Sequence, residues 1–197
     1  KLRPSKLSEV LGQTHLVGKN KVLNNLVKNK KIFNMILFGK SGTGKTTIAL
    51  CLMNELNLRY RMLNATINSK KDFEVVIEEA KMYGQMILIV DEIHRMNKDK
   101  QDILLSFIES GVIKLIGLTN ANPYHSINPA IRSRCQLIEL HELNSKDIEK
   151  GIKRVKEVLP DIKMDNKTIS YIANISNGDI RYAYNLIEFM YYGLNKE

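Results

Sequence analysis

The segment from Gly39 to Thr46 restricts the possible folds of this chain more than any other feature. It reads Gly-Lys-Ser-Gly-Thr-Gly-Lys-Thr, follows an apolar run at 32–38 and precedes a stretch of helical character at 47–50. A segment of the form G-x-x-x-x-G-K-[ST] between a strand and a helix is a P-loop. Its backbone N–H groups surround phosphate oxygens. The alternative, an ordinary glycine-rich turn, does not explain this strand–loop–helix setting, so the segment predicts a nucleoside triphosphate site.

The residues of this loop have separate expected roles. Glycines allow the backbone to turn sharply and to approach a phosphate closely. The helix that follows presents unpaired N–H groups and a favourable dipole to an anion. We expect Lys45 to reach the β- and γ-phosphates and the Thr46 hydroxyl to ligate Mg²⁺. The nucleotide-binding residues predicted in this segment are Gly39, Lys40, Ser41, Gly42, Thr43, Gly44, Lys45, Thr46 and Thr47.

Length and composition favour a globular protein without a membrane span. The chain has 197 residues, of which 44% are hydrophobic, and this suits one large domain or one domain with a small appendage. No apolar run approaches the roughly 20 residues that a membrane span needs. The two cysteines exclude a disulfide framework and a four-cysteine zinc site, which favours the cytoplasm. The polar, basic start argues against a signal peptide, and the lack of an initiator Met suggests an excised fragment.

The positive charge of the chain is concentrated near its start. The net charge is +9, and residues 1–50 carry ten Lys or Arg residues against Glu9 alone, so this segment accounts for the whole excess. A basic segment predicts binding to a polyanion, of which nucleic acid is the most common large example. The equally weighted alternative is that the basic run at 28–31 merely ends a helix, where cations are favoured.

The hydrophobic pattern alternates between strands and helices as far as His141. Helices are expected between successive strands, and this alternation predicts an α/β fold with a five-stranded parallel sheet flanked by helices. The expected strands lie at 32–38, 60–63, 86–90, 112–118 and 136–140.

After His141 only helical periodicity is found, in three segments that are broken at Pro160 and at Asn177-Gly178. We therefore expect an α/β nucleotide-binding subdomain at residues 1–142 and a small helical lid subdomain at residues 143–197.

Polar residues follow two of the expected strands. The apolar run 86–90 ends in Asp91-Glu92, and the next strand ends in Thr119-Asn120. Ligands of open α/β sheets bind at the carboxyl ends of strands, so these residues should lie beside the P-loop. We expect Asp91 to hold Mg²⁺, Glu92 to act as general base, and Asn120 to contact the γ-phosphate or the attacking water. The alternatives are a solvated acidic pair and a simple turn former.

The tetrad Asp91-Glu92-Ile93-His94 also matches the D-E-x-H pattern of a helicase superfamily. That interpretation requires a second motor domain, for which 197 residues leave no room. A hydrogen-bonded structural role is expected for His94.

Several short motifs along the chain belong together. They are Arg3-Pro4, Gly12-Gln13, the P-loop, Asp91-Glu92, Thr119-Asn120, Ser133-Arg134-Cys135 and Gly178-Asp179-x-Arg181. Taken together, they resemble the motifs of an AAA+ ATPase of the clamp-loader type. The resemblance implies that Arg134 is a finger inserted into a neighbouring subunit's active site and that Arg181 is a lid residue that contacts the nucleotide. A finger acting in trans implies an oligomer with sites at subunit interfaces.

Finer matches narrow this resemblance. They are Gly12-Gln13-x-His15-Leu16-x-Gly18, Leu63-Asn64-Ala65, Asp91 to Lys98, Ile116-Gly117 and Asn122-Pro123. Over nearly the whole chain, these segments resemble the replication-associated recombination protein A family. Lys40-Ser41 departs from the family's usual Pro-Pro, Asp99-Lys100-Gln101 from its usual Gln pair, and Asn120-Ala121 from its usual Thr-Glu. The family's C-terminal oligomerisation region is missing, which implies an N-terminal ATPase core fragment.

This family resemblance implies a biological setting and an adenine pocket. It implies a cytoplasmic, nucleoid-associated ATPase that uses ATP and Mg²⁺ and acts on DNA at single-strand/duplex junctions or ends of stalled replication forks. The full-length protein would be a homo-oligomer, with a single-stranded-DNA-binding protein as a further partner. Val10 and Leu11 would contact the adenine. A clamp-loader-type assembly subunit and a DNA-binding scaffold with a regulatory ATP site remain alternatives.

Overall fold

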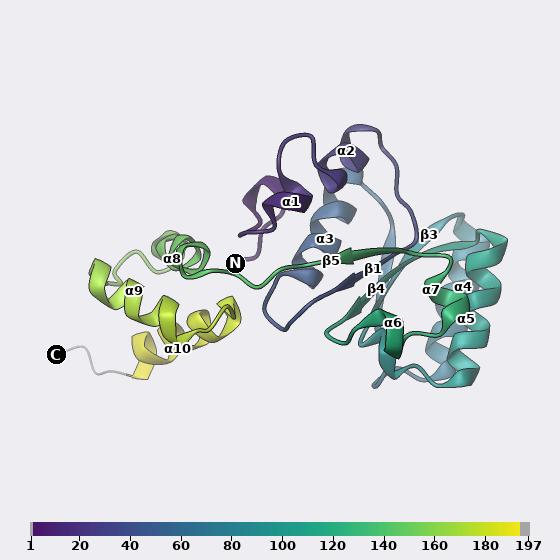
Figure 1. Ribbon diagram of the computed structural model, residues 1–197. Helices are drawn as coiled ribbons and strands as arrows, with labels where there is room; N and C mark the ends of the chain where they lie inside the picture. The colour runs from purple at the N-terminus through teal and green to yellow at the C-terminus, as the bar shows by residue number, and fades with distance from the viewer. Residues whose placement is uncertain (1, 194–197) are drawn as a thin grey trace.

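The computed structural model describes residues 2–193 (Figure 1). Its sheet has five strands in the order β2-β3-β4-β1-β5, and every neighbouring pair is parallel. The predicted five-stranded parallel sheet is confirmed, although the first strand starts at Met35, three residues later than expected. The strands are β1 (Met35–Phe38), β2 (Tyr60–Asn64), β3 (Met86–Asp91), β4 (Ile113–Thr119) and β5 (Gln136–Glu139).

Helices connect the strands and follow the last one. Three 3₁₀ turns accompany them, at Leu7–Glu9, Ile93–Arg95 and Arg154–Glu157. Before β5 the α-helices are α1 (Thr14–Val17), α2 (Val22–Lys28), α3 (Lys45–Leu56), α4 (Lys70–Tyr83), α5 (Lys98–Ser110), α6 (Pro123–Ser126) and α7 (Pro129–Arg132). After β5 they are α8 (Ser145–Lys153), α9 (Asn166–Ile175) and α10 (Ile180–Gly193).

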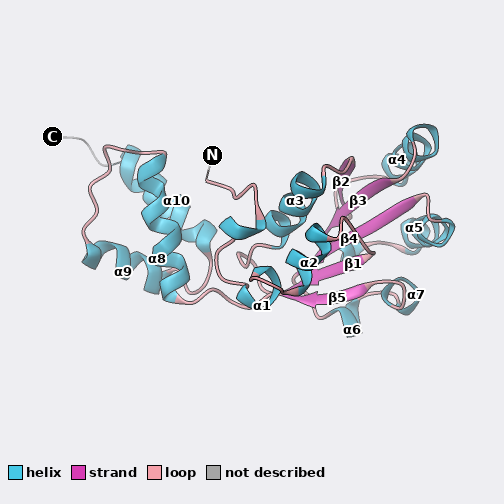
Figure 2. Ribbon diagram, turned by 90° about the horizontal axis from the view of Figure 1, so that it is seen from above, coloured by secondary structure: helices cyan, strands magenta, loops and turns pink. Residues whose placement is uncertain are grey.

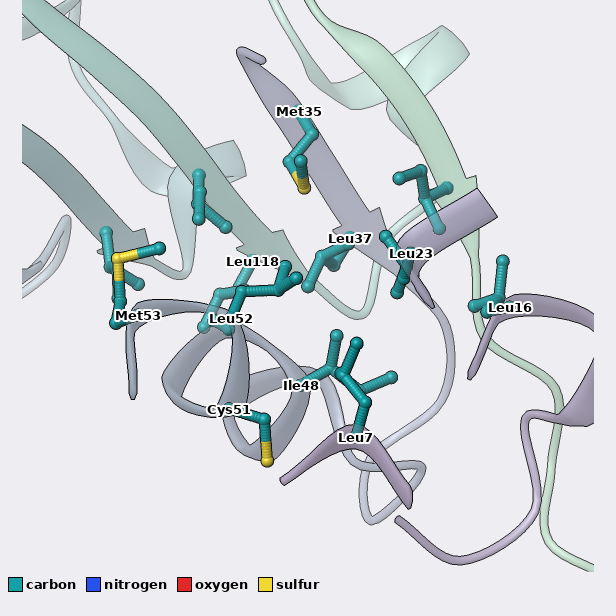
Figure 3. Close-up of a cluster of buried hydrophobic side chains, with 14 of the residues drawn as sticks. Leu7, Leu16, Leu23, Met35, Leu37, Ile48, Cys51, Leu52, Met53 and Leu118 are labelled. Atoms are coloured by element: carbon teal, nitrogen blue, oxygen red, sulfur yellow. The ribbon is translucent and has the colours of Figure 1, made fainter. Parts of the chain in front are cut away.

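The sheet is covered on both faces, so its strands alternate between two cores. Along β3, Ile87 and Ile89 join a core with α1, α2 and α3, whereas Leu88 and Val90 join a second core with α4 and α5. This follows from the period of two along a strand. Figure 3 shows the first core, with Leu52 of α3 close to the strands. The continuous apolar run at 86–90 thus reflects burial on both faces.

The helices after β5 have a core of their own. Residues such as Ile148 of α8, Ile172 of α9 and Ile187 of α10 pack together away from the sheet. In Figures 1 and 2 this helical region lies beyond the sheet end toward which the strand arrows point. The chain reverses between α9 and α10 at Asn177 and Gly178, both with positive φ, as the predicted break requires. The helical C-terminal region is confirmed, and the boundary at 142/143 stays a prediction.

Among residues 2–193, no helix combines the length and the apolar character that a membrane crossing requires.

Candidate nucleotide site

The P-loop connects the carboxyl end of β1 to the first turn of α3. Helix α3 begins at Lys45, and Gly44 precedes it with a φ of 103°. Gly42 also has a positive φ, of 78°. L-residues with a side chain rarely adopt this left-handed conformation, so the two glycines allow the loop to curl back over the helix N-terminus. The free N–H groups of that terminus face the inside of the curl, where they favour an anion.

Lys45 extends back across this loop. Its Nζ donates hydrogen bonds to the backbone oxygens of Gly39, at 2.6 Å, and Lys40, at 2.8 Å. Burial lowers the pKa of Lys45 below its ordinary value of 10.5, and the positive charge of Arg181 lowers it further, whereas Asp91 and Glu92 act in the opposite direction. Among residues 2–193, the only hydrogen-bond acceptors of the Lys45 ammonium group are these two neutral carbonyl oxygens. A bound anion would stabilise the charge of this desolvated group, so the loop suits a phosphate.

A cavity of about 570 Å³ opens above the loop, between the N-terminal segment, the carboxyl end of the sheet and the helical region. It brings together most of the residues predicted from the sequence. Of these, Val10, Leu11, Ser41, Gly42, Thr43, Gly44, Lys45, Thr46, Thr47, Asp91, Glu92, Asn120 and Arg181 line the cavity. Gly39 and Lys40 form the back of the loop instead, where their carbonyl groups bind Lys45.

The cavity is lined by both polar and apolar side chains. Thr46, Asp91 and Glu92 lie on its walls together with apolar side chains such as Leu143 and Ile180. Hydroxyl and carboxylate oxygens are suitable ligands for Mg²⁺. Within the described part of the chain, no three His, Cys, Asp or Glu side chains gather closely enough to hold a metal ion by themselves. The donor set therefore fits Mg²⁺ that arrives with the phosphates, since this ion keeps waters and takes few protein ligands.

Glu92 is held at the tip of β3 by a short network. Its φ of 54° places it in the left-handed region, and its N–H donates to Asp91 Oδ1 at 2.9 Å. Glu92 Oε2 lies 3.6 Å from His94 Nε2, and His94 Nδ1 lies 2.8 Å from Thr119 Oγ1. Thr119 is buried at the end of β4. His94 therefore hydrogen-bonds to Thr119 at the end of β4, in agreement with its expected structural role, and its other ring nitrogen lies close to the Glu92 carboxylate. The sequence pattern did not indicate this contact between the ends of two neighbouring strands.

The N-terminus of α10 packs directly on the P-loop. Arg181 donates through Nη2 to the Ser41 hydroxyl. A Cβ atom added to Gly42 would lie 2.9 Å from the Cα of Asp179, which is closer than real Cβ contacts. Arg181, which the resemblance predicts to act from the lid, thus lies next to the P-loop of its own chain. Asp179 also lies against the loop, and no role was expected for it from the sequence.

Lys40 connects the P-loop to the hinge, by which we mean residues 140–144 between β5 and α8. Its Nζ forms an ion pair with Glu142, between β5 and α8, and both side chains are largely exposed. Lys40 and Ser41, which depart from the family's usual Pro-Pro, therefore both have partners outside the loop. Lys40 contacts the hinge, and Ser41 contacts Arg181 of the helical region.

Arg134 lies apart from this cavity. It precedes β5, so it belongs to the amino end of the sheet, and its guanidinium pairs with Glu109 and donates to the Ala130 carbonyl oxygen at 2.7 Å. The structure does not bring it together with the P-loop of its own chain. A role in a neighbouring subunit's site stays a prediction.

Gln13 is a component of the site that the sequence analysis singled out only as part of a motif. Its Nε2 donates to the carbonyl oxygens of Thr43, at 3.0 Å, and His141, at 2.7 Å, and its Oε1 accepts the His141 N–H at 2.9 Å. The side chain is 5% exposed. The Gln13 amide thus connects the N-terminal segment, the P-loop and the hinge. These contacts join residues far apart in the sequence, so no local sequence pattern predicts them.

Comparison with known proteins identifies the class of this fold and site. Residues 35–143 match the family model described as "ATPase family associated with various cellular activities (AAA)". The chain belongs to this AAA family and is an ATPase domain of the P-loop class.

Within that family, the predicted resemblance to replication-associated recombination protein A is confirmed. The protein of that name from Bacillus subtilis (strain 168) is 44% identical over 95% of this chain and 46% of its own length. "ATPase WRNIP1" from Dictyostelium discoideum is 38% identical over 100% of this chain and 23% of its own length. The chain thus spans less than half the length of these two curated relatives.

A solved structure shares the fold over nearly all of the chain. The "Thermotoga maritima RuvB Holliday junction branch migration motor" superposes with a TM-score of 0.84 at 26% sequence identity, covering 97% of this chain and 65% of that one. The match includes the helices after β5, so the α/β sheet and the helical region occur together in both proteins.

Proposed function

We propose that this chain binds ATP with Mg²⁺, hydrolyses it to ADP and phosphate, and uses the energy to remodel DNA at stalled replication forks or recombination intermediates. The observation that carries the proposal is the cavity in which Lys45, Asp91, Glu92 and Arg181 converge on one P-loop. A desolvated lysine at the loop, a second cation beside it and two carboxylates in the same cavity are what phosphoryl transfer to water requires.

Each of these groups has a separate part in the proposed reaction. The loop N–H groups and Lys45 bind the triphosphate, while Thr46 and Asp91 hold Mg²⁺, which neutralises charge on the phosphate oxygens. Glu92 accepts a proton from the attacking water, whose oxygen bonds to the γ-phosphorus as the bond to ADP breaks. Asn120, at the tip of β4, contacts the γ-phosphate or this water.

Arg181 closes the lid over the nucleotide. It starts from the Ser41 hydroxyl, so it needs to move only from the loop to the phosphates that the loop binds. Val10 and Leu11 on the cavity wall are apolar, as an adenine ring requires. Arg134 completes the site of an adjacent copy within a homo-oligomer.

The proposed action on DNA has separate support. The names of the relatives refer to replication-associated recombination and to branch migration of Holliday junctions. The basic N-terminal quarter of this chain suits a polyanionic partner. We propose single-strand/duplex junctions or ends as the DNA structures, a single-stranded-DNA-binding protein as a partner, and a cytoplasmic, nucleoid-associated location.

The test is the substitution Glu92→Gln. The amide keeps the shape of the side chain but does not accept the proton, so turnover should fall about 10²–10⁴-fold while ATP binding persists. Glu74→Gln on the exposed side of α4 is the matched control. Intact turnover in Glu92→Gln would exclude Glu92 as the general base. The DNA proposal is tested by the ATPase rate of the full-length protein, which should rise on addition of single-strand/duplex junction DNA.

A further inference from the structure

Apart from Arg134 beside β5, the residues at the amino ends of the strands have no part in the proposed ATPase reaction. They lie at the end of the sheet opposite the strand tips that carry the P-loop and the two acids (Figure 2). Basic and aromatic side chains precede or begin four of the strands, and all of them except the half-buried Lys114 are exposed. We call the surface that they form the amino-end surface and define it by Lys30, Lys31, Phe33, Arg59, Tyr83 and Lys114.

Two cation–aromatic pairs mark the ends of this surface. Arg59 lies over the Tyr83 ring, 5.4 Å from its centre, between the starts of β2 and β3. Lys114 lies over the Phe33 ring at 5.9 Å, between the starts of β4 and β1. Tyr83 is 64% exposed and Phe33 50% exposed, so part of each ring remains accessible to a ligand.

The backbone at both pairs is fixed by the sheet. The Arg59 carbonyl oxygen accepts a hydrogen bond from the Ile87 N–H at 3.1 Å. Next to Phe33, Asn34 Oδ1 accepts from the Leu115 N–H at 2.9 Å. The Tyr83 ring therefore projects from the end of α4 toward the fixed Arg59, and the Phe33 ring projects next to the fixed Asn34. A partly fixed surface loses less entropy when a ligand stacks on it.

The charge of the surface is largely uncompensated. Within residues 2–193, Lys30, Lys31, Arg59 and Lys114 form no ion pair with an acidic side chain. Lys30 and Lys31 lie between the end of α2 and the start of β1, shortly before Phe33 in the sequence, and are exposed.

We propose that the amino-end surface binds single-stranded nucleic acid, whose phosphates contact the free cations and whose bases stack on Tyr83 and Phe33. The strand order puts three strand spacings between β2 and β1, or about 14 Å at about 4.8 Å each. A stretch of this length spans more than one nucleotide, so one strand can contact both cation–aromatic pairs. An acidic protein would satisfy the cations but would leave the two exposed rings without planar partners.

This inference rests on the proposed action on DNA, for which it supplies a binding surface separate from the ATP site. The experiment measures fluorescence anisotropy of a labelled single-stranded oligothymidine across a salt series. In Tyr83→Ala the affinity should fall about fivefold or more, as loss of one stacked base predicts. In Arg59→Gln/Lys114→Gln the slope of log affinity against log salt should decrease by about 1.4, or 0.7 for each lost phosphate contact.

Helix α9 supplies a matched control, since Tyr171 is 66% exposed and lies four residues after Lys167. Lys167→Gln/Tyr171→Ala should bind as the unchanged chain does, and all variants should keep the basal ATPase rate. If the unchanged chain binds and the amino-end variants bind equally well, the surface is wrong and the DNA proposal stands. If charge removal weakens binding but Tyr83→Ala does not, the surface is a general polyanion site and base stacking is refuted. If the unchanged chain shows no binding at low salt, both proposals fail.

Discussion

Replacement of Gly42 by alanine tests whether the helical region rests on the P-loop as the structure shows. Gly42 has a φ of 78°, and the left-handed conformation costs an L-residue about 1–2 kcal/mol. The added Cβ would also lie 2.5 Å from Cγ and 2.9 Å from Cα of Asp179. Overpacking of this kind costs about 1–3 kcal/mol more unless the two parts separate. The total expected loss in free energy of unfolding is about 2–5 kcal/mol.

Gly111 provides the control for the backbone contribution. Its φ is 74°, close to that of Gly42, but a Cβ there would meet nothing within 4 Å. Gly111→Ala should therefore lose only about 1–2 kcal/mol, which in a chain of this size is a fall in Tm of about 2–8 °C. Thermal and urea unfolding followed by circular dichroism measure both variants, and Gly42→Ala should be the less stable of the two.

A double-mutant cycle then assigns the extra loss to the contact. Asp179→Ala alone removes the acceptor of the Arg181 N–H, at 2.9 Å, and should cost about 1 kcal/mol as the loss of a helix cap. In the Gly42→Ala background it should cost less, because the Cγ that meets the new methyl group is gone. The coupling energy should exceed about 0.5 kcal/mol. Strict additivity, together with equal stability of Gly42→Ala and Gly111→Ala, would refute the contact between lid and loop.

Three further predictions concern single side chains. His94→Ala should lower kcat for ATP about tenfold with KM unchanged, because Glu92 loses its tether to β4; a KM effect alone would contradict this. Burial raises the pKa of both Cys51 and Cys135 to about 12. Iodoacetamide at pH 8 should therefore alkylate the native protein far more slowly than the urea-unfolded chain. Rapid labelling of the native protein would contradict the buried positions. The lowered pKa of Lys45 means that the unfolded chain binds more protons just below pH 10.5, so this side chain's contribution to stability rises with pH up to that value. Urea unfolding at several pH values should show a smaller rise in Lys45→Met, and identical pH profiles would exclude this burial.

The sheet and its nucleotide end were predictable because they rest on local signals. The P-loop has a fixed spacing, and the apolar run before Asp91 marks a strand covered on both faces, so Asp91 and Glu92 had to lie at a strand tip beside the loop. Arg181 and Arg134 came from motif resemblance rather than from periodicity. The structure places Arg181 on the loop, while the role of Arg134 depends on a second copy of the chain.

The contacts that surround the site were not predictable, because each joins residues far apart in sequence. Lys40 and Ser41 differ from the family pattern, and only the folded chain shows that they meet Glu142 and Arg181. Phe33 is similar. Phe33 lies inside the apolar run that was expected to form the first strand. Strand β1 starts only at Met35, and the Phe33 ring is exposed. Apolar character alone does not distinguish a buried strand residue from an exposed ring at its edge.

The Gln13 amide has a practical consequence for any shortened version of the protein. The family match begins at residue 35, which suggests a minimal ATPase unit that starts with β1. A chain cut there would lack the donor for the Thr43 carbonyl oxygen and both hydrogen bonds to the His141 peptide group. Each such hydrogen bond contributes about 0.5–1.5 kcal/mol net, so the P-loop and the segment between β5 and α8 would lose stability together. A stable ATPase domain therefore begins before Gln13, well ahead of residue 35, where the family match begins.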